Sequence, residues 1–429
     1  MLRRLLLVLA LAAAAVCAQA PSPAPTPPEQ QKPVKTYTLP PDKLAKAIAY
    51  SRARNTLHFV EFAYGALVLL GVVAWKLAPR FRHWAQAASR RRFVQAYIFA
   101  PLLLLTLDVL NLPASLFDQH LSLEYGQSIQ GWGSWFWDWT KGELIEFLLA
   151  GVLVWILYGV IRRSPRRWWF YFWLVSIPIV VFLEFVEPVV ITPLFYQFEP
   201  LAARQPALVA EIEKVTARGG LMIPRERMFE MKASEKLNSV NAYVAGFGAS
   251  KRVVVWDTTI AKMTTPQILF VFGHEMGHYV LGHVPLLIGV VCLLLLIFLY
   301  AAFLAMDRLI RRVGKRWDIP SLADWASLPL LLLVVTVVSF LFEPALNSLS
   351  RELEHNADVY GLEVTHGIVP DAPQAAAQAF QILGEVSLSD PDPSGFVKFW
   401  LYDHPALPER VRFAAEYNPW ATGTPKYVK

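Results

Sequence analysis

The chain has 429 residues, of which 55% are hydrophobic and 17% are charged, and its mean hydropathy is +0.38. This composition is too apolar for an ordinary soluble domain and predicts several membrane spans. The formal net charge of +6 does not indicate nucleic-acid binding, because the basic residues cluster beside apolar segments, where they set membrane orientation.

The N-terminus has the composition of a leader. Residues 1–20 combine two arginines, a short apolar core and an Ala-Gln-Ala ending, which is typical of a signal peptide. Pro21 disfavours cleavage directly after Ala20, so the alternative is a short N-terminal anchor. Residues 21–41 hold eight prolines and are predicted to form a stiff, extended linker.

Six apolar segments are long enough to cross a membrane. They lie near 59–78, 94–116, 143–161, 168–188, 284–305 and 328–346. The first four predict an N-terminal membrane domain over 42–188, and the last two belong to a second domain over 189–429.

The loops between these segments differ in charge. The loops after the first, third and fifth segments are rich in arginine and lysine, whereas the loop 117–142 contains a single basic residue, Lys141. Basic short loops stay in the cytoplasm. We therefore expect the segment 189–265 and the C-terminal tail to lie on the extracytoplasmic face of a bacterial inner membrane.

Carboxylates occur inside or at the edges of the predicted spans. A carboxylate that faces lipid costs several kcal/mol, so these side chains are expected to face a wet interior, to pair, or to reach the interface from helix ends. A transporter would show the same feature. The residues are Glu61, Asp108, Glu146, Glu184, Glu187 and Glu343.

The segment 200–265 is less apolar and has mixed periodicity. Residues 206–220 have helical spacing, 241–248 are predicted to be extended before a glycine turn, and the β-branched run at 251–260 predicts a strand. The fold class is therefore mainly α, a multi-pass helical bundle with a small α+β insert at the membrane surface.

The sequence VFGHEMGHYVLGH, residues 271–283, stands at the head of the fifth span. His274 and His278 are four residues apart, which places both imidazoles on one face of a helix, close enough to bind one metal ion. Glu275 lies beside them and can take a proton from water that the metal activates. This is the HExxH pattern of zinc proteases.

A catalytic zinc site needs a third protein ligand. His283 is about 140° round a helix from His278, so it is expected to be structural. After Glu275 the next glutamate is Glu343, and Glu354 and Asp358 follow the sixth span, which returns the chain to the same side of the membrane. Spacing alone does not choose between Glu343 and Glu354.

HEMGHYVLGH, followed by SRELEHNAD at 350–358, resembles the type I CAAX prenyl endopeptidases, integral-membrane zinc proteases related to the HtpX-like proteases. The stretches 36–60, 191–201 and 403–411 are also similar to that family. The resemblance implies a gluzincin-like zinc-protease domain over 189–429 with one Zn²⁺ per chain.

The resemblance also implies roles for individual residues. Glu354 would be the third zinc ligand, Glu275 the general base, and Asp358 the partner of a ligand histidine. His404 and Arg410 would stabilise the tetrahedral intermediate. The backbone of Asn241, Ala242 and Tyr243 would pair with the substrate as an added strand does.

The chain departs from the eukaryotic members of that family in two features. Those members act on prenylated C-termini at the cytosolic face and carry an additional N-terminal helix, where this chain has its leader. The expected partners are a peptide or protein substrate and the lipid bilayer, with no nucleic acid. The alternatives are a quality-control protease of damaged membrane or exported proteins and, from another class, a transporter or non-proteolytic scaffold.

Overall fold

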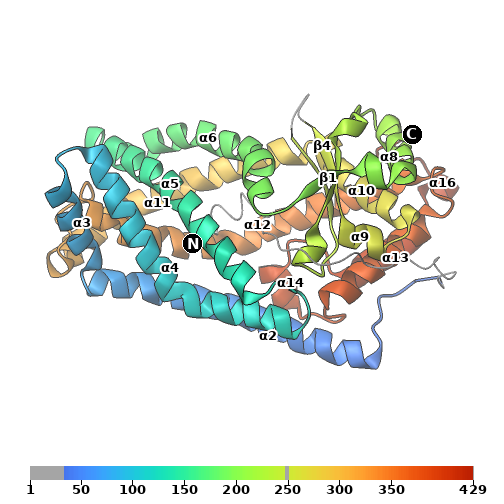
Figure 1. The fold of residues 1–429 in the computed structure, drawn as a ribbon, viewed down its shortest axis with the longest axis horizontal. Coiled ribbons are helices and arrows are strands. Elements are labelled where there is room, and N and C mark those ends of the chain that lie inside the picture. Colours follow the sequence, from blue (N-terminus) through green and yellow to red (C-terminus); the bar gives the residue numbers. More distant parts are fainter. Residues whose placement is uncertain (1–32, 247–250, 429) are drawn as a thin grey trace.

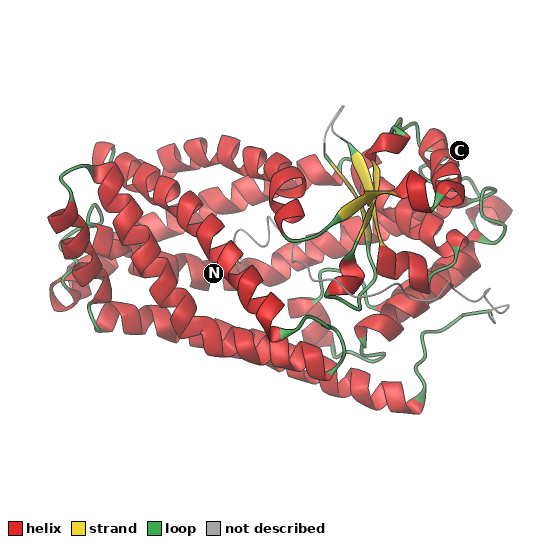
Figure 2. Ribbon diagram, viewed as in Figure 1, coloured by secondary structure: helices red, strands yellow, loops and turns green. Residues whose placement is uncertain are grey.

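The computed structural model describes residues 33–246 and 251–428, so the predicted leader lies outside the described residues. Long helices run side by side along the longest axis of the molecule, and a small sheet with shorter helices lies at one end (Figures 1 and 2). The mainly helical fold class predicted from composition is therefore confirmed.

Six helices of the described chain are long and apolar enough to cross a membrane, which confirms the number of predicted spans. They are α2 (Pro41–Ala74), α4 (Arg92–Glu124), α5 (Trp132–Arg163), α6 (Trp168–Val186), α11 (His283–Trp317) and α12 (Leu328–Thr365). Most of these helices extend beyond the predicted bounds, because hydropathy detects only the apolar part of a helix.

The first span shows the largest difference from its predicted bounds. The sequence predicts a span near 59–78, but α2 begins at Pro41 and ends at Ala74. Lys76 then adopts a left-handed conformation (φ 54°), and a short helix that was not predicted, α3 (Leu77–Ala88), follows. The first half of α2 is polar and continues past the apolar segment toward the sheet.

The basic loops gather at the end of the bundle opposite the sheet (Figure 1). Arg82 of α3 is buried and donates to the carboxylates of Asp318 and Asp324 in the loop between α11 and α12. Arg162, at the end of α5, donates to the carbonyl of Ala323 in the same loop. The three loops predicted to share one side of the membrane therefore lie together.

The sheet has four short strands in the order β1-β2-β4-β3. They are β1 (Phe198–Pro200), β2 (Met228–Met231), β3 (Ala242–Ala245) and β4 (Arg252–Trp256). The prediction of a strand over 251–260 was too long, because helix α9 (Asp257–Lys262) begins directly after Trp256. Asp257 in its first turn favours a helix start, whereas the β-branched run ends at Val255.

Shorter helices lie at the same end of the molecule as the sheet, and several of them share a hydrophobic core with it. The helix predicted at 206–220 is confirmed as α8 (Pro206–Arg218). The others in this region are α7 (Leu201–Arg204), α10 (Thr265–Val280), α13 (Ala372–Ser387), α14 (Gly395–Leu401), α15 (Leu407–Glu416) and α16 (Pro419–Thr422). The helices that share the core with the sheet include α8, α10, α13 and α15.

Helices α10 and α12 cross at glycine residues. A Cβ added at Gly361 of α12 would lie 2.9 Å from the backbone nitrogen of His274, and one at Gly277 of α10 would lie 3.1 Å from the Tyr360 ring. The two backbones therefore approach too closely for larger side chains, and this contact fixes α10 against the part of α12 that follows its apolar span.

We expect the Gly361→Ala substitution to lower the free energy of unfolding by about 1–3 kcal/mol, because the new methyl group must push two backbones apart. Gly289→Ala in α11 is the matched control, since an added Cβ there meets none of the described residues within 4 Å. Thermal unfolding in one detergent compares the two variants. Equal melting temperatures would contradict the close crossing.

Candidate active site

The HExxH motif lies on α10, a helix with a well-defined start and end. Thr264 and Gln267 form a capping box at its N-terminus. Gly282, with φ 73°, then interrupts the helix before α11 begins at His283. The prediction that the motif heads the fifth span as one helix was therefore wrong, because a left-handed glycine separates the two helices.

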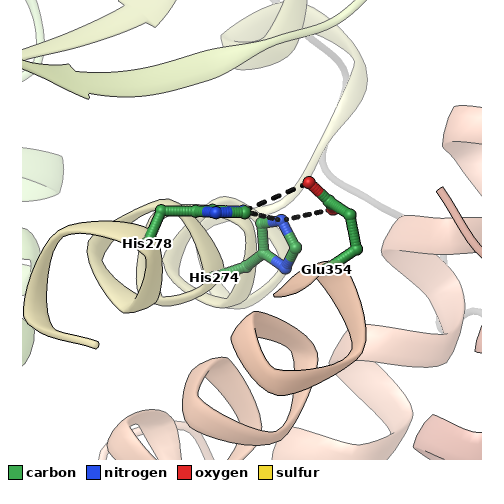
Figure 3. Close-up of side chains that lie close together, drawn as sticks. All are labelled: His274, His278 and Glu354. Carbon is green, nitrogen blue, oxygen red and sulfur yellow. Dashed lines mark hydrogen bonds and ion pairs between the residues drawn. The ribbon is translucent and has the colours of Figure 1, made fainter. Parts of the chain in front are cut away.

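The structure brings His274, His278 and Glu354 together (Figure 3). The Nε2 atoms of His274 and His278 lie 3.2 Å apart. Oε2 of Glu354 lies 3.2 Å from Nε2 of His274, and Oε1 lies 3.3 Å from Nε2 of His278. Two imidazole nitrogens and a carboxylate from two crossing helices thus converge on one point.

This donor set fits a divalent metal ion. Two nitrogens and one oxygen are the ligand types that zinc takes from proteins. Within the described residues, Oε2 of Glu354 is buried and makes no hydrogen bond of good geometry, so its lone pairs remain available. Burial would lower the pKa of His274, but Asp358 and Glu354 raise it to about 10, which shows that the two carboxylates favour a positive charge here.

Asp358 contacts the Nδ1 side of the His274 ring, and Arg410 binds Asp358. Oδ1 of Asp358 lies 2.8 Å from Nδ1 of His274, on the far side of the ring from Glu354. Arg410 of α15 donates to both carboxylate oxygens of Asp358, from Nε at 2.9 Å and from Nη2 at 2.6 Å. Nη2 of Arg410 also lies 3.8 Å from Oε2 of Glu354. Arg410 therefore contacts both Asp358, which orients His274, and Glu354, the third candidate metal ligand.

His404 reaches the same carboxylate from the C-terminal tail. Its Nε2 lies 3.1 Å from Oε2 of Glu354, and its Nδ1 lies 2.8 Å from Oδ1 of Asp403. Partial desolvation would lower the pKa of His404, whose side chain remains half exposed, but Glu354 and Asp403 raise it. Sequence reasoning missed Asp403, although its place directly before His404 was the available signal.

Glu275 is half-buried on α10 beside the two histidines. Burial raises the pKa of its carboxyl group, while the positive charge of His274 and His278 opposes that shift. A carboxylate of raised pKa next to a metal-binding pair is suited to accept and return a proton.

His283 contacts the motif without joining the candidate ligand set. Its Nδ1 lies 3.1 Å from Nδ1 of His278, on the side of that ring away from Glu354. The angle about a continuous helix does not apply across the break at Gly282. The contact orients the His278 ring, in keeping with the structural role expected for His283.

The residues expected to bind substrate lie at an edge of the sheet. β3 pairs with β4 on one side only, and its other side ends the sheet. The N–H of Asn241 is bonded to Thr259, and its carbonyl accepts from Trp256. Because successive residues of a strand point their backbone groups to opposite sides, Ala242 and Val244 present theirs to the open edge.

Glu343, the other candidate third ligand by spacing, lies away from the two histidines. Its Oε2 is 3.1 Å from Nε2 of His58 on α2. A second group of acids, Asp108, Glu143 and Glu146, gathers between α4 and α5. It contains no histidine, and it shows that some of the acids expected within the spans lie close to one another.

Two protein-family models together match nearly the whole chain. Residues 202–418 match the model of peptidase family M48. Residues 25–197 match a family described as the CAAX prenyl protease N-terminal region, with five membrane helices.

Similar proteins span the chain almost end to end. An uncharacterized metalloprotease of Bacillus subtilis, YhfN, is 35% identical over 87% of this chain and 86% of its own. A CAAX prenyl protease 1 homolog of Oryza sativa is 25% identical over 89% of this chain and 91% of its own. The crystal structure of S. mikatae Ste24p has a TM-score of 0.73 and 21% identity, covering 88% of this chain and 89% of that one, and it shares the fold.

The family match covers the part of the chain that carries the histidine pair and Glu354, and the close relative extends it to the membrane helices. The resemblance to CAAX prenyl proteases inferred from the motifs is confirmed. The chain therefore belongs to peptidase family M48 and is a multi-pass membrane metalloprotease.

Proposed function

We propose that the protein is a zinc endopeptidase in which His274, His278 and Glu354 hold one Zn²⁺ per chain. The observation that carries this proposal is the convergence of two imidazole nitrogens and a carboxylate within 4.8 Å of one another. Zinc held in this way supplies Lewis-acid chemistry, because it lowers the pKa of water toward 7 and polarises a carbonyl group.

The side chains around the zinc ligands have distinct tasks. Glu275 accepts the proton of the attacking water and returns it to the leaving amine. His404 donates a hydrogen bond to the oxyanion, and the raised pKa of its imidazole favours the protonated form that this task requires. Asp358 fixes the orientation of the His274 ring, and Arg410 fixes Asp358.

The substrate adds a strand to the open edge of β3. Of the three residues expected to bind substrate at this edge, Asn241, Ala242 and Tyr243, Asn241 already uses both of its backbone groups, and Tyr243 is paired with Val254 of β4. Ala242 therefore pairs with the substrate, together with the next outward-facing residue, Val244. Such pairing requires an extended peptide, so flexible segments are cleaved and rigid folded domains are not.

The relatives named CAAX prenyl protease 1 homolog suggest a substrate that is cut near its C-terminus. General cleavage of damaged membrane or exported proteins is the second candidate. An edge strand binds the backbone of a peptide, which is the same in every sequence. Membership of a peptidase family disfavours the transporter or scaffold, although acids within the spans would suit either.

Cleavage of unfolded β-casein by the purified chain tests the function. We expect cleavage that depends on zinc and is absent from the His274→Ala/His278→Ala variant, while a folded, stable domain remains intact. The proposal would be contradicted if the wild-type protein bound zinc but, like the variant, cleaved neither β-casein nor any peptide from a random library.

The active site faces the extracytoplasmic side of a bacterial inner membrane in this proposal. Two observations support this orientation. The basic loops lie at the opposite end of the bundle, and α2 begins beside α13, at the same end as the histidine pair. A chain that enters the membrane behind a signal peptide delivers that end outside.

We expect a peptide tag added after Lys429 to be digested by protease supplied outside spheroplasts, since the C-terminal tail lies with α10 and α12. A tag inserted between Arg163 and Arg166 is the control for the opposite face and should be protected until the cells are lysed. Protection of the C-terminal tag with digestion of the loop tag would reverse the orientation.

A further inference from the structure

Residues 34–38, called the strap below, lie along α13 and are held by two glutamine side chains. The amide of Gln374 accepts from the N–H of Val34 at 2.7 Å and donates to its carbonyl at 2.9 Å. The amide of Gln381 makes the same pair of bonds with Thr38, at 3.2 and 2.6 Å. Each glutamine therefore binds the backbone of one residue of the strap in the way that a neighbouring strand would.

The spacing of the two glutamines matches the strap. Gln374 and Gln381 are seven residues apart, which places them on one face of a helix and about 10 Å apart along it. Val34 and Thr38 are four residues apart, about 13 Å in an extended chain. A straight peptide laid along α13 therefore meets both side chains at once.

Tyr37, which lies between Val34 and Thr38 in the strap, fills a slot on α13 beyond Gln381, at Gly384. Its ring is buried, with 6% of the residue exposed, and its hydroxyl donates to the carbonyl of Ser389 at 3.0 Å. A Cβ added at Gly384 of α13 would lie 2.3 Å from the ring. Glycine at this position is therefore what leaves room for the tyrosine. Lys35 and Thr36, in contrast, are exposed.

The contacts concentrate where α13 ends. The last carbonyls of a helix have no partner within it, and here groups from the N-terminal part of the chain bind one of them and the carbonyls of the two residues that follow the helix. Gln127 donates to the carbonyl of Val386, Ser51 to that of Leu388, and Tyr37 to that of Ser389. From this point the chain continues through α14 to His404.

Helix α14 is in turn fixed to α12 close to the candidate zinc ligand. Asn347 donates to the carbonyl of Trp400, and Arg351 donates to the carbonyls of Lys398 and Tyr402. The strap therefore contacts the chain at Ser389, and the chain then runs through α14, which α12 holds, to His404 beside Glu354.

We propose that the strap is a tethered peptide ligand of α13, and that its docking holds the connection from α13 to α14, and through it His404, in the active position. Tyr37, Gln374 and Gln381 are positioning residues in this arrangement. The binding of the strap stands independently of the catalytic proposal, whereas the consequence for His404 rests on the proposed function.

Hydrogen–deuterium exchange of the backbone amides in residues 33–40 measures docking directly in the full-length protein. We expect Tyr37→Ala, and Gln374→Ala/Gln381→Ala, to accelerate this exchange about tenfold or more. Thr36→Ala and Lys35→Ala alter exposed side chains of the same segment and should leave exchange unchanged. Equal exchange in the wild-type protein and in Tyr37→Ala would overturn the proposal.

Gly384→Ala tests the slot from the side of α13. An alanine normally stabilises a helix relative to glycine, but here its methyl group would meet the tyrosine ring, so we expect strap release and a lower melting temperature. In a Tyr37→Ala background the ring is gone, and Gly384→Ala should become neutral or stabilising. If Gly384→Ala lowered the melting temperature equally in both backgrounds, the slot at Gly384 would not be specific for Tyr37.

The effect on catalysis is separated from a loss of stability by kinetics on β-casein. A displacement of about 1 Å at a catalytic group costs about 100-fold in rate, so strap release should lower kcat by about 10- to 100-fold with KM unchanged. Tyr37→Phe keeps the ring but loses the hydrogen bond to the Ser389 carbonyl, so its kcat should lie between that of Tyr37→Ala and that of the wild-type protein. Accelerated exchange with unchanged kcat would overturn the link to His404, while an inactive wild-type protein would sink the proposed function and leave the exchange result standing.

Discussion

We expect the Glu275→Gln substitution to lower kcat for peptide hydrolysis by about 10²- to 10⁴-fold, because the amide cannot accept the proton of the attacking water. KM and zinc content remain close to those of the wild-type protein, since glutamine preserves the shape of the side chain and Glu275 is not among the three converging ligands. Steady-state cleavage of β-casein, together with zinc analysis of the same samples, measures both quantities.

Glu352→Gln is the matched control for that substitution. Glu352 lies on α12, two residues before Glu354, and its side chain is exposed. We expect full activity from it. Wild-type kcat in Glu275→Gln would remove the general base from the mechanism and leave the metal centre without an assigned proton acceptor.

We expect the Glu354→Ala substitution to remove stoichiometric zinc and, with it, measurable activity. The substitution takes away one of three converging protein ligands and leaves a pair of imidazoles that bind zinc weakly. Asp358→Asn should have a smaller effect, a 10- to 100-fold weaker affinity for zinc, because it alters only the partner of His274. Zinc content after dialysis against graded concentrations of a chelator ranks the variants.

Glu343→Ala is the informative control for this series, because Glu343 is the other glutamate that sequence spacing allows as third ligand. In the structure it faces His58 rather than the histidine pair. The variant should therefore retain its zinc. Loss of zinc from Glu343→Ala with retention in Glu354→Ala would exchange the two assignments.

The membrane helices were the most predictable part of the fold, since each is encoded in a local run of apolar residues. Their ends were less predictable. The polar first half of α2 has no hydropathy signal, and β-branched residues lie on both sides of the boundary between β4 and α9, in Val253–Val255 and again in Thr258–Ile260.

The histidine pair could be placed from spacing because both residues share one helix. The third ligand could not, since the distance between α10 and Glu354 depends on how two helices cross at Gly277 and Gly361, and only the family resemblance selected Glu354 over Glu343. The break at Gly282 was also missed, because a glycine inside an apolar segment does not reveal its φ angle.

Contacts between distant parts of the chain that belong to no motif could not be predicted from the sequence. Val34 and Gln374 are 340 residues apart, and neither belongs to a motif. The same limit applies to the edge strand, where Asn241 was expected to pair with substrate. Its backbone is taken by Thr259 and Trp256, and this followed only from the three-dimensional arrangement.

The most direct test of the zinc centre is X-ray absorption spectroscopy at the zinc edge on the purified full-length protein. Our account predicts one zinc ion per chain, with two imidazole nitrogens at about 2.0–2.1 Å and oxygen ligands at about 2.0–2.2 Å, and a signal that disappears in His274→Ala/His278→Ala. A protein without zinc, or one whose zinc spectrum is the same in that variant, would contradict it.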